Sequence, residues 1–463
     1  MNIRQKMKIK ESVDKKLGSI KASASKLQNL KKSFFTKKAS DHSVSDSPDV
    51  NGRQLVAALD IGTEYVKALV AEVEGDNINV IGVSKKHQSL TDMYAGAIAD
   101  ISGVVDNCEA ALAEAENIAG SGVSRAVLGI AGELVRGITY TITYKRTNPE
   151  AQITAEEMQF VIEKAQTQSK QKAAGQLSEE TGEDDIDVKL INSAIVAMYV
   201  DGYKISNPIG FQGAKLSIRL YSAFAPMVHI GALQQVAHQL ELDLMAIAAE
   251  PFAVSRTVIG TDPSSSISAI LIDVGGGTTD IAFVEEGGVQ GTRSFGIGGR
   301  SFTKAIAEDL GINFEQAEKL KLNLGSTEYP VAQRNAATQS LQRTTETWLA
   351  GVELCISEFI EEQGDKYGAL PSVIMLCGGG SSLEMLPKTL NTAGWFKDLP
   401  FSHKPRIGLI RADAAKGIKD LTEKVSDHTF ITALGLLRVG QDTMISIEPE
   451  SKLKESFKKV LRT

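Results

Sequence analysis

Short apolar runs and amphipathic helical patterns alternate along residues 53–440. Two apolar runs joined by a turn at 55–75 predict a β-hairpin, and later runs at 78–83 and 125–130 flank a helical pattern over 101–119. A second series predicts a hairpin at 269–284, helices at 300–310, 314–324 and 336–362, and a strand at 372–377. This alternation predicts an α/β fold.

Residues 133–225 follow a different pattern. Two short strands near 137–144 precede a helix that begins with a capping box, Thr154 with Glu157, and is expected to end near Gln168. The polar stretch 169–187 predicts a loop. Further strands are predicted at 190–199 and 215–221, and a helix at 228–240 and a strand at 244–249 then complete the first series.

Residues 268–300 carry the strongest chemical signal in the chain. An apolar strand ends at Asp273, three consecutive glycines follow at 275–277, and a second strand begins after Thr278. Three glycines cost backbone entropy that a turn of this length does not require, which indicates that something approaches the backbone closely. Successive N–H groups in such a turn bind phosphate, and Asp273 is placed to hold the accompanying magnesium ion. For this motif alone, a plain hairpin loop is the alternative.

The same strand, turn and strand unit occurs near the start of the first series. Asp60, Gly62 and Thr63 correspond there to Asp273 and the first two glycines of the later copy. This duplication predicts two similarly folded halves that face each other with a phosphate between them. A third glycine loop, CGGGSS at 377–382, follows a buried strand and precedes an apparent helix start at Ser381.

The order of these motifs, LDIGT at 59, LIDVGGGTTD at 271, AEKLK at 317 and LCGGGSS at 376, resembles the superfamily of actin, sugar kinases and heat-shock-chaperone ATPases. Within it, INVIGVSKKHQSL at 78, DGYKISNPIGFQGAKLSIRL at 201 and FGIGGRSFTKAIAEDL at 295 resemble the bacterial cell-division protein FtsA. The likeness covers residues 53–440, and NPIGFQG is its most specific part. It implies an actin-like ATPase fold, with two RNase H-like domains around a nucleotide cleft and an inserted FtsA-type (SHS2/1C) subdomain.

The resemblance also implies ATP and magnesium as cofactors. Asp60 and Asp273 would hold the metal through water, and Glu318 with Lys321 would grip the ribose and adenine side. The phosphates and base would be held by three turns, which contain Gly62 and Thr63, then Gly275, Gly276, Gly277 and Thr278, and finally Gly378, Gly379 and Gly380. By spacing alone, Glu318 and Lys321 also fit an ordinary surface ion pair.

Glu250 ends a predicted strand and is followed by Pro251. In actin-like ATPases a carboxylate at this place orients the attacking water, and the resembling chaperones and the bacterial actin MreB have Glu-Pro here. FtsA commonly lacks the glutamate. The presence of Glu250 therefore allows hydrolysis, and we expect the protein to be a slow ATPase at most. A capping role of Glu250 at a helix N-terminus is the alternative.

The resemblance divides the chain into segments. The first actin-like domain (1A) comprises residues 53–132, 226–267 and about 429–447, and it is interrupted by the FtsA-type subdomain (1C) at 133–225. The second domain (2A) comprises 268–312 and 371–428, with subdomain 2B at 313–370. The remaining segments are a basic N-terminal stretch at 1–38, a linker at 39–52 and a C-terminal helix at 448–463.

Charge is distributed unevenly along the chain. The formal net charge is −7, but residues 1–40 carry +10 and residues 451–463 carry +4, which leaves −21 for the remainder. Anionic surfaces should therefore repel the protein except at its two ends, and no nucleic-acid partner is expected. The three cysteines lie far apart without metal-ligand spacing, which favours a reducing cytoplasm, and no apolar run approaches the roughly 20 residues of a membrane span.

Both ends have apolar residues at helical spacing between lysines. The N-terminal stretch fits either a solvated tail or a basic amphipathic helix that lies on anionic lipid or on a partner. The C-terminal segment places Leu453, Phe457, Val460 and Leu461 on one face. FtsA characteristically ends in a membrane-targeting helix of this kind, and packing of the segment on the body of the protein is the alternative.

The sequence thus predicts an ATP-binding, FtsA-like protein that polymerises at the cytoplasmic face of the cell membrane and anchors the division ring. Expected partners are further copies of the chain in a filament, a tubulin-like division-ring protein, the anionic membrane surface, and other division proteins that contact 133–225. A PilM-like scaffold of type IV pilus assembly is the alternative, which Lys67 and GGRSFT at 298 fit well. A metabolic kinase is a weaker alternative, because it would need a catalytic aspartate in a sugar pocket and the sequence offers no candidate. A chaperone is also weaker, because it would need a substrate-binding domain after Gly440.

Overall fold

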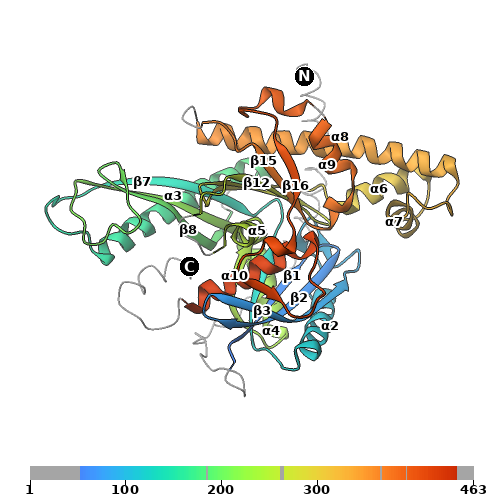
Figure 1. Cartoon of the computed structure of the whole chain (residues 1–463), viewed down its shortest axis with the longest axis horizontal. Helices are drawn as coiled ribbons and strands as arrows, with labels where there is room; N and C mark the ends of the chain where they lie inside the picture. The colour runs from blue at the N-terminus through green and yellow to red at the C-terminus, as the bar shows by residue number, and fades with distance from the viewer. Residues whose placement is uncertain (1–52, 184–185, 261–264, 365–367, 393, 446–463) are drawn as a thin grey trace. The chain divides into compact units, whose positions relative to one another are not determined.

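The computed structural model describes residues 53–183, 186–260, 265–364, 368–392 and 394–445 (Figure 1). The predictions for the N-terminal stretch, the linker and the C-terminal helix, including its four apolar residues Leu453, Phe457, Val460 and Leu461, lie outside these residues. Residues 174–187 belong to a separate compact unit from residues 53–173 and 188–445. The fold described below is that of the larger unit, together with the end of helix α3 at residues 174–181.

The first sheet has the strand order β11-β6-β1-β2-β3-β17 among the described residues. Strands β1, β2 and β3 form an antiparallel meander. Strands β6 and β11 add in parallel on the other side of β1. A short strand, β17, extends the other edge parallel to β3. The strands are β1 (Leu55–Ile61), β2 (Tyr65–Glu74), β3 (Asn77–His87), β6 (Arg125–Ile130), β11 (Asp243–Ala249) and β17 (Ile418–Asp420).

The second sheet repeats this arrangement. Strands β12, β13 and β14 form an antiparallel meander, β15 adds in parallel beside β12, and β16 adds in parallel beside β15. These strands are β12 (Ala269–Val274), β13 (Thr279–Glu285), β14 (Gly288–Phe295), β15 (Val373–Cys377) and β16 (Arg406–Leu409). The equal strand order confirms the internal duplication that the repeated turn predicted.

The strands of residues 133–225 continue the second sheet beyond β14 in the order β7-β10-β8-β9. The junction is an antiparallel pairing of β7 with β14, in which Gly137 lies opposite Thr292. The added strands are β7 (Arg136–Lys145), β8 (Val188–Val200), β9 (Tyr203–Lys204) and β10 (Lys215–Pro226). The insertion is therefore hydrogen-bonded to the second sheet, although its chain leaves from the first. The domain boundaries themselves stay a prediction.

Helix α3 (Ala155–Thr181) corrects one expectation from the sequence. The helix was expected to end near Gln168 and to be followed by a loop over 169–187, which is wrong because the helix continues to Thr181. Ala165, Ser169 and Ala173 are fully buried at four-residue spacing. The Ser169 hydroxyl donates to the carbonyl of Ala165 at 2.9 Å, so this polar residue is satisfied inside the helix.

Apart from α3, which lies on a third core in the insertion, the described helices fall into two groups according to the core that they cover. Tyr221, Phe252 and the apolar faces of α2 (Ile101–Ala119), α4 (Met227–Gln239), α5 (Glu250–Ile259) and α10 (Ile431–Ile445) belong to the first core. The second core contains residues of α6 (Gly299–Leu310), α7 (Phe314–Leu322), α8 (Val331–Gln363) and α9 (Met385–Thr392). The remaining short elements are β4 (Met93–Tyr94), β5 (Ala97–Ile98), η2 (Gly379–Ser382), η3 (Trp395–Asp398), η4 (Ala412–Ala414) and η5 (His428–Phe430).

Strand β12 is apolar except for Asp273, because both of its faces are buried. Ile270, Ile272 and Val274 lie in the second core, while Ala269 and Leu271 lie in the first. Because side chains alternate between the faces of a strand, both faces of β12 are covered, and neither needs polar residues. Asp273 is the exception, and it lies where the strand ends.

Helices α5 and α10 approach each other closely at Gly435. A Cβ atom at this position would lie 2.0 Å from the carbonyl oxygen of Ala253. Only glycine permits this approach. The packing fixes the start of α5, and therefore Glu250, against the first sheet.

Candidate nucleotide site

The site is built where three strands end. Asp60 lies near the end of β1, Asp273 near the end of β12, and Glu250 is the first residue of α5 directly after β11. All three side chains are buried. Strand pairing places Lys67 opposite Asp60 and Asp280 opposite Asp273, so the two halves contribute equivalent pairs.

Lys67 is the cation of this cluster. Its Nζ lies 2.7 Å from Oδ2 of Asp60. Burial lowers the pKa of Lys67, but the attraction of Asp60, its hydrogen bond to Asp60, and the more distant Asp273 and Glu250 raise the pKa above its ordinary value. Lys67 therefore stays charged and partly offsets the surrounding carboxylates.

Burial raises the pKa of Glu250 well above its ordinary range, and repulsion from Asp60, Asp280 and Asp273 adds to the shift, while Lys67 opposes it. Burial also raises the pKa of Asp273, although hydrogen bonds to its carboxylate counteract part of the effect. One of these comes from the Thr432 hydroxyl, which donates to Oδ2 of Asp273 at 2.5 Å. The cluster thus favours the arrival of a cation or of protons.

The described residues include no group of three or more His, Cys, Asp or Glu side chains placed to ligate a metal ion. Asp60 and Asp273 nevertheless supply the hard oxygen atoms that magnesium prefers, and magnesium usually keeps several of its waters. The donor set therefore fits an ion held through water, as the sequence predicted, and does not fit a closed cage of protein ligands.

The two glycine turns have the same backbone geometry. Gly62 N–H donates to the carbonyl of Tyr65 at 3.1 Å, and Gly275 N–H donates to the carbonyl of Thr278 at 2.9 Å. The turns also touch, because a Cβ on Gly276 would lie 2.7 Å from the Cβ of Glu64. At Gly277, an added Cβ would lie 2.6 Å from Oγ1 of Thr63. Contact between the two halves therefore requires these glycines, independently of any ligand.

The third glycine loop lies against the second aspartate. Gly378 has φ +79°, and a Cβ there would lie 2.0 Å from Oδ1 of Asp273. A Cβ on Gly380 would lie 2.5 Å from Cγ1 of Val274, whereas Gly379 has open space around it. The helix start expected at Ser381 is wrong in detail, because residues Gly379–Ser382 form a 3₁₀ turn and α9 begins at Met385. The loop is too tightly packed on β12 to continue directly into an α-helix.

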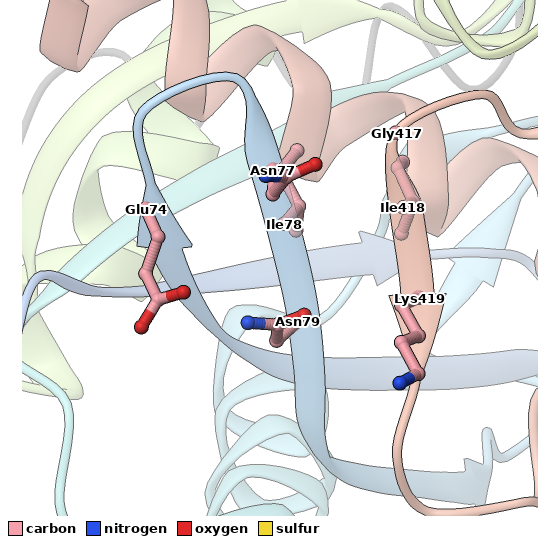
Figure 2. Close-up of a pocket in the computed structure, with 7 residues that line it drawn as sticks. All are labelled: Glu74, Asn77, Ile78, Asn79, Gly417, Ile418 and Lys419. Carbon is pink, nitrogen blue, oxygen red and sulfur yellow. The ribbon is translucent and has the colours of Figure 1, made fainter.

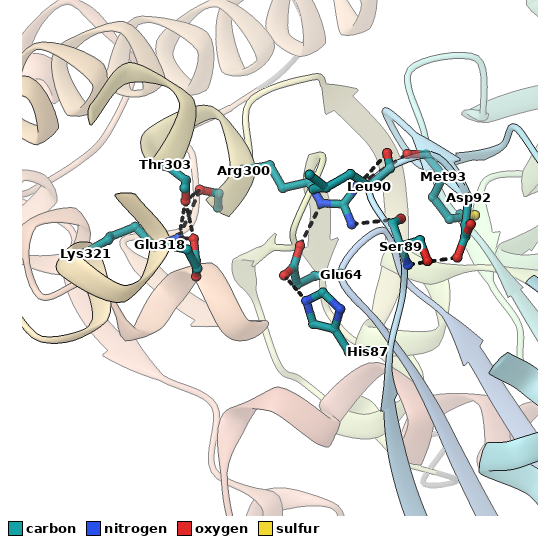
Figure 3. A network of polar contacts seen from close by, with 11 residues as sticks. Glu64, His87, Ser89, Leu90, Asp92, Met93, Arg300, Thr303, Glu318 and Lys321 are labelled. Carbon is teal, nitrogen blue, oxygen red and sulfur yellow. Dashed lines mark hydrogen bonds and ion pairs between the residues drawn. The ribbon is translucent and has the colours of Figure 1, made fainter. Parts of the chain in front are cut away.

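Glu318 and Lys321 form the expected pair on one face of α7, with Nζ 2.7 Å from Oε2 (Figure 3). Lys321 is buried and also donates to Oγ1 of Thr303 at 2.7 Å and to the carbonyl of Gly299 at 3.1 Å. Gly299 N–H in turn donates to the carbonyl of Gly275 at 2.9 Å. The pair is therefore connected to the second glycine turn through the start of α6, which an ordinary surface pair would not be.

Sequence reasoning missed several residues of the site. Asp280 and Thr432 were not identified, and Lys67 was noted only as a likeness to PilM. A signal was present, because Lys67 follows Asp60 by seven residues and Asp280 follows Asp273 by seven. Equal spacing in two hairpins implies equal cross-strand positions.

A separate surface hollow of about 230 Å³ lies at the edge of the first sheet (Figure 2). It is lined by Glu74, Asn77, Ile78, Asn79, Gly417, Ile418 and Lys419. None of the nucleotide-site residues predicted from the sequence contributes to it. The hollow therefore adds nothing to the assignment of the site.

Asp280 gives the ligand-free protein a dependence of stability on pH. Burial and the nearby Asp273 raise its pKa from 3.8 to about 7, against hydrogen bonds from Ser294 and Thr278. In this window the folded state holds a proton that the unfolded state has lost, so stability falls as pH rises from about 4 to about 7. Asp280→Asn removes this titration and should leave the ligand-free protein about 4 kcal/mol more stable than wild type above pH 7.

Urea denaturation at about pH 5 and about pH 8 measures the effect of Asp280→Asn. The wild type should lose more stability between these conditions than the variant. The stability of the variant should still fall with rising pH, but less steeply, because Glu250 and Asp273 remain and their pKa values are also raised. Equal losses in the two proteins would contradict the role assigned to Asp280.

Comparisons with known proteins agree with this geometry. The family model for cell division protein FtsA matches residues 270–435. Cell division protein FtsA of Bacillus subtilis is 26% identical over 72% of this chain and 75% of its own length. FtsA of Neisseria meningitidis is 24% identical over 83% of this chain and 90% of its own length. The chain is an FtsA-like protein.

The fold of this FtsA-like protein is that of an actin-like ATPase, as predicted. The solved PilM-PilN type IV pilus biogenesis complex contains a chain that matches 85% of this one and 99% of its own length, with a TM-score of 0.58 and 16% identity. At this identity the likeness concerns the fold alone. In the described part of the chain, no helix combines the length and the apolar character that crossing a membrane would take.

Proposed function

We propose that this FtsA-like chain binds ATP with magnesium and acts as an actin-like scaffold of the bacterial division ring. One observation carries the nucleotide part of the proposal. Two equivalent strand ends bring Asp60 and Asp273 into one buried cluster with Lys67 and Glu250, at the meeting point of two glycine turns. The similarity to FtsA proteins along most of the chain supports the division role.

Each residue has a proposed task in this site. Asp60 and Asp273 hold magnesium through water, and the turns at Gly62–Thr63 and Gly275–Thr278 present N–H groups to the β and γ phosphates. Bound magnesium would neutralise charge on these phosphates. Gly378–Gly380 flank the α-phosphate and base, and Glu318 with Lys321 hold the ribose and adenine side.

Glu250 is the candidate for slow hydrolysis. Its raised pKa, caused first by burial, makes the Glu250 carboxylate a stronger base than an exposed glutamate, which suits a group that accepts a proton from water. The side chain also lies at the first position of α5, where a carboxylate interacts favourably with the helix dipole. We therefore assign a slow ATPase activity at most, with binding and assembly as the main function.

The proposed place of action is the cytoplasmic face of the cell membrane. Nucleotide binding would favour closed subunits that join into a filament, which links a tubulin-like division-ring protein to the bilayer. The basic C-terminal segment with Leu453, Phe457, Val460 and Leu461 is the proposed lipid contact, and residues 133–225 the proposed contact for other division proteins.

A scaffold of type IV pilus assembly is the second candidate. The specific observation in its favour is the fold match to the chain from the PilM-PilN complex, which extends over nearly the whole of that chain. A neighbouring gene for a division-ring protein, rather than for pilus components, favours the division role.

Titration calorimetry with ATP and magnesium tests the nucleotide site. The wild type should bind, and Asp273→Asn should weaken binding by about 10–100-fold, because the substitution removes one of two carboxylates that orient the hydrated ion. Asp413→Asn is the matched control. Asp413 is an exposed carboxylate that forms an ion pair with Arg411 and is not part of the proposed site. Absence of binding heat in the wild type would refute the proposed nucleotide function.

Sedimentation with anionic lipid vesicles tests the scaffold. Assembly on vesicles that requires ATP supports the division role, and loss of vesicle binding after deletion of residues 451–463 supports the lipid contact. Soluble turnover of ATP without assembly would instead favour an enzyme.

A further inference from the structure

Arg300 and Glu64 join the two halves directly at the glycine turns. Nε of Arg300, the second residue of α6, donates to Oε2 of Glu64 at 2.6 Å, and Glu64 follows the first glycine turn (Figure 3). The partners are 236 residues apart in sequence. Their side chains are 14% and 20% exposed, so the charges are largely shielded from solvent.

Both residues are held in place by further contacts. The Arg300 guanidinium also reaches the carbonyl oxygens of Ser89 and Leu90 at 3.4 Å and that of Met93 at 3.5 Å. The other carboxylate oxygen of Glu64 lies 2.7 Å from Nε2 of His87. Arg300 thus crosses from the second half onto two segments of the first.

The ion pair is tied to both glycine turns. Arg300 N–H donates to the carbonyl of Gly276 at 2.8 Å, and Gly276 packs so closely on Glu64 that a Cβ would not fit between them. Any separation of the turns must therefore stretch or break the pair. A charge-assisted hydrogen bond in a shielded setting is among the stronger polar contacts in proteins.

We propose that Glu64 and Arg300 are positioning residues that form a clasp, which holds the two phosphate turns together and slows nucleotide entry and release. This inference rests on the proposed nucleotide function. Neither residue needs to touch the nucleotide, because the clasp acts through the distance between the turns. Loss of the clasp should change the rates of binding and release more than it changes the hydrolysis step.

Stopped-flow release of a fluorescent ADP analogue from the full chain tests the clasp. Glu64→Gln and Arg300→Gln should each speed release by roughly tenfold or more, since truncation of one member of a shielded charge pair acts mainly on dissociation. The double variant should release no faster than the faster single variant, because both substitutions remove the same contact. Glu315→Gln is the matched control and should leave the rate unchanged, since the Glu315–Lys319 pair on α7 is exposed.

A second measurement separates the clasp from the nucleotide function. Amide hydrogen exchange of the ligand-free protein should rise in peptides that cover residues 62–66 and 88–94 when Glu64 is replaced by Gln. If the wild type binds nucleotide but the substitutions change neither the release rate nor the hydrogen exchange, the clasp is refuted and the proposed nucleotide site is retained. If exchange rises but the wild type binds no nucleotide, the contact joins the halves and the proposed role in nucleotide release is refuted.

Discussion

Lys67→Met is expected to destabilise the ligand-free protein by about 3–5 kcal/mol and to abolish nucleotide binding. The lysine ion-pairs with Asp60 at 2.7 Å, and its charge also opposes the raised pKa of Glu250 and of Asp273. Methionine has a similar length but no charge, so the variant leaves buried carboxylates without their cation. Phosphate binding should fail as well, because the remaining charges at the strand ends repel it.

Urea denaturation near neutral pH, followed by calorimetry with ATP and magnesium, measures both effects of Lys67→Met. Lys319→Met is a suitable control, because Lys319 is exposed and pairs only with its helix neighbour Glu315 in the described contacts. The loss of stability caused by Lys67→Met should become smaller as pH falls toward about 5, because the buried carboxylates can then take up protons. A variant with wild-type stability at neutral pH would show that Lys67 does not balance the cluster.

Gly378→Ala is expected to disrupt the third glycine loop. The residue has φ +79°, and the added Cβ would lie 2.0 Å from Oδ1 of Asp273 and 2.6 Å from the carbonyl oxygen of Val274. Either the loop or Asp273 must move, at an expected cost of about 2–4 kcal/mol. Because Asp273 would be displaced, affinity for ATP should fall by roughly 100-fold.

Gly379→Ala provides the control at the adjacent position. A Cβ on Gly379 meets no atom within 4 Å, so this variant should keep nearly normal stability of the ligand-free protein. The comparison separates the effect of the specific contact at Gly378 from a general loss of glycine in the loop. Equal losses of stability in the two variants, measured by urea denaturation, would contradict the assigned contact with Asp273.

The repeated hairpin was visible in the sequence because its chemistry is local. An apolar run, an aspartate and a glycine turn lie within about ten residues of one another in both copies, so spacing alone revealed the duplication. The sequence also predicted that Glu318 and Lys321 share one face of a helix, which the ion pair confirms. These predictions required only strand and helix periodicity.

The length of α3 could not be predicted from the same pattern. Residues 169–181 are mainly polar, and the stripe of small buried residues Ala165, Ser169 and Ala173 gives little hydrophobic signal. What the structure shows is that Ala165 lies in one core with residues of the insertion strands, such as Met198 and Ile218, a contact that intrinsic periodicity does not reveal. The attachment of the insertion to the second sheet through β7 and β14 was equally invisible, since strand pairing across long separations leaves no local signature.

The sequence by itself determined the α/β alternation, the two Asp-containing turns and the glycine loop at 378–380, because each depends on neighbours in the chain. Only the tertiary structure decided that Lys67 balances the acidic cluster, that Thr432 donates to Asp273, and that Arg300 reaches Glu64. Such contacts depend on the three-dimensional approach of distant segments, and a side chain's charge or hydrogen-bonding capacity does not specify its partner.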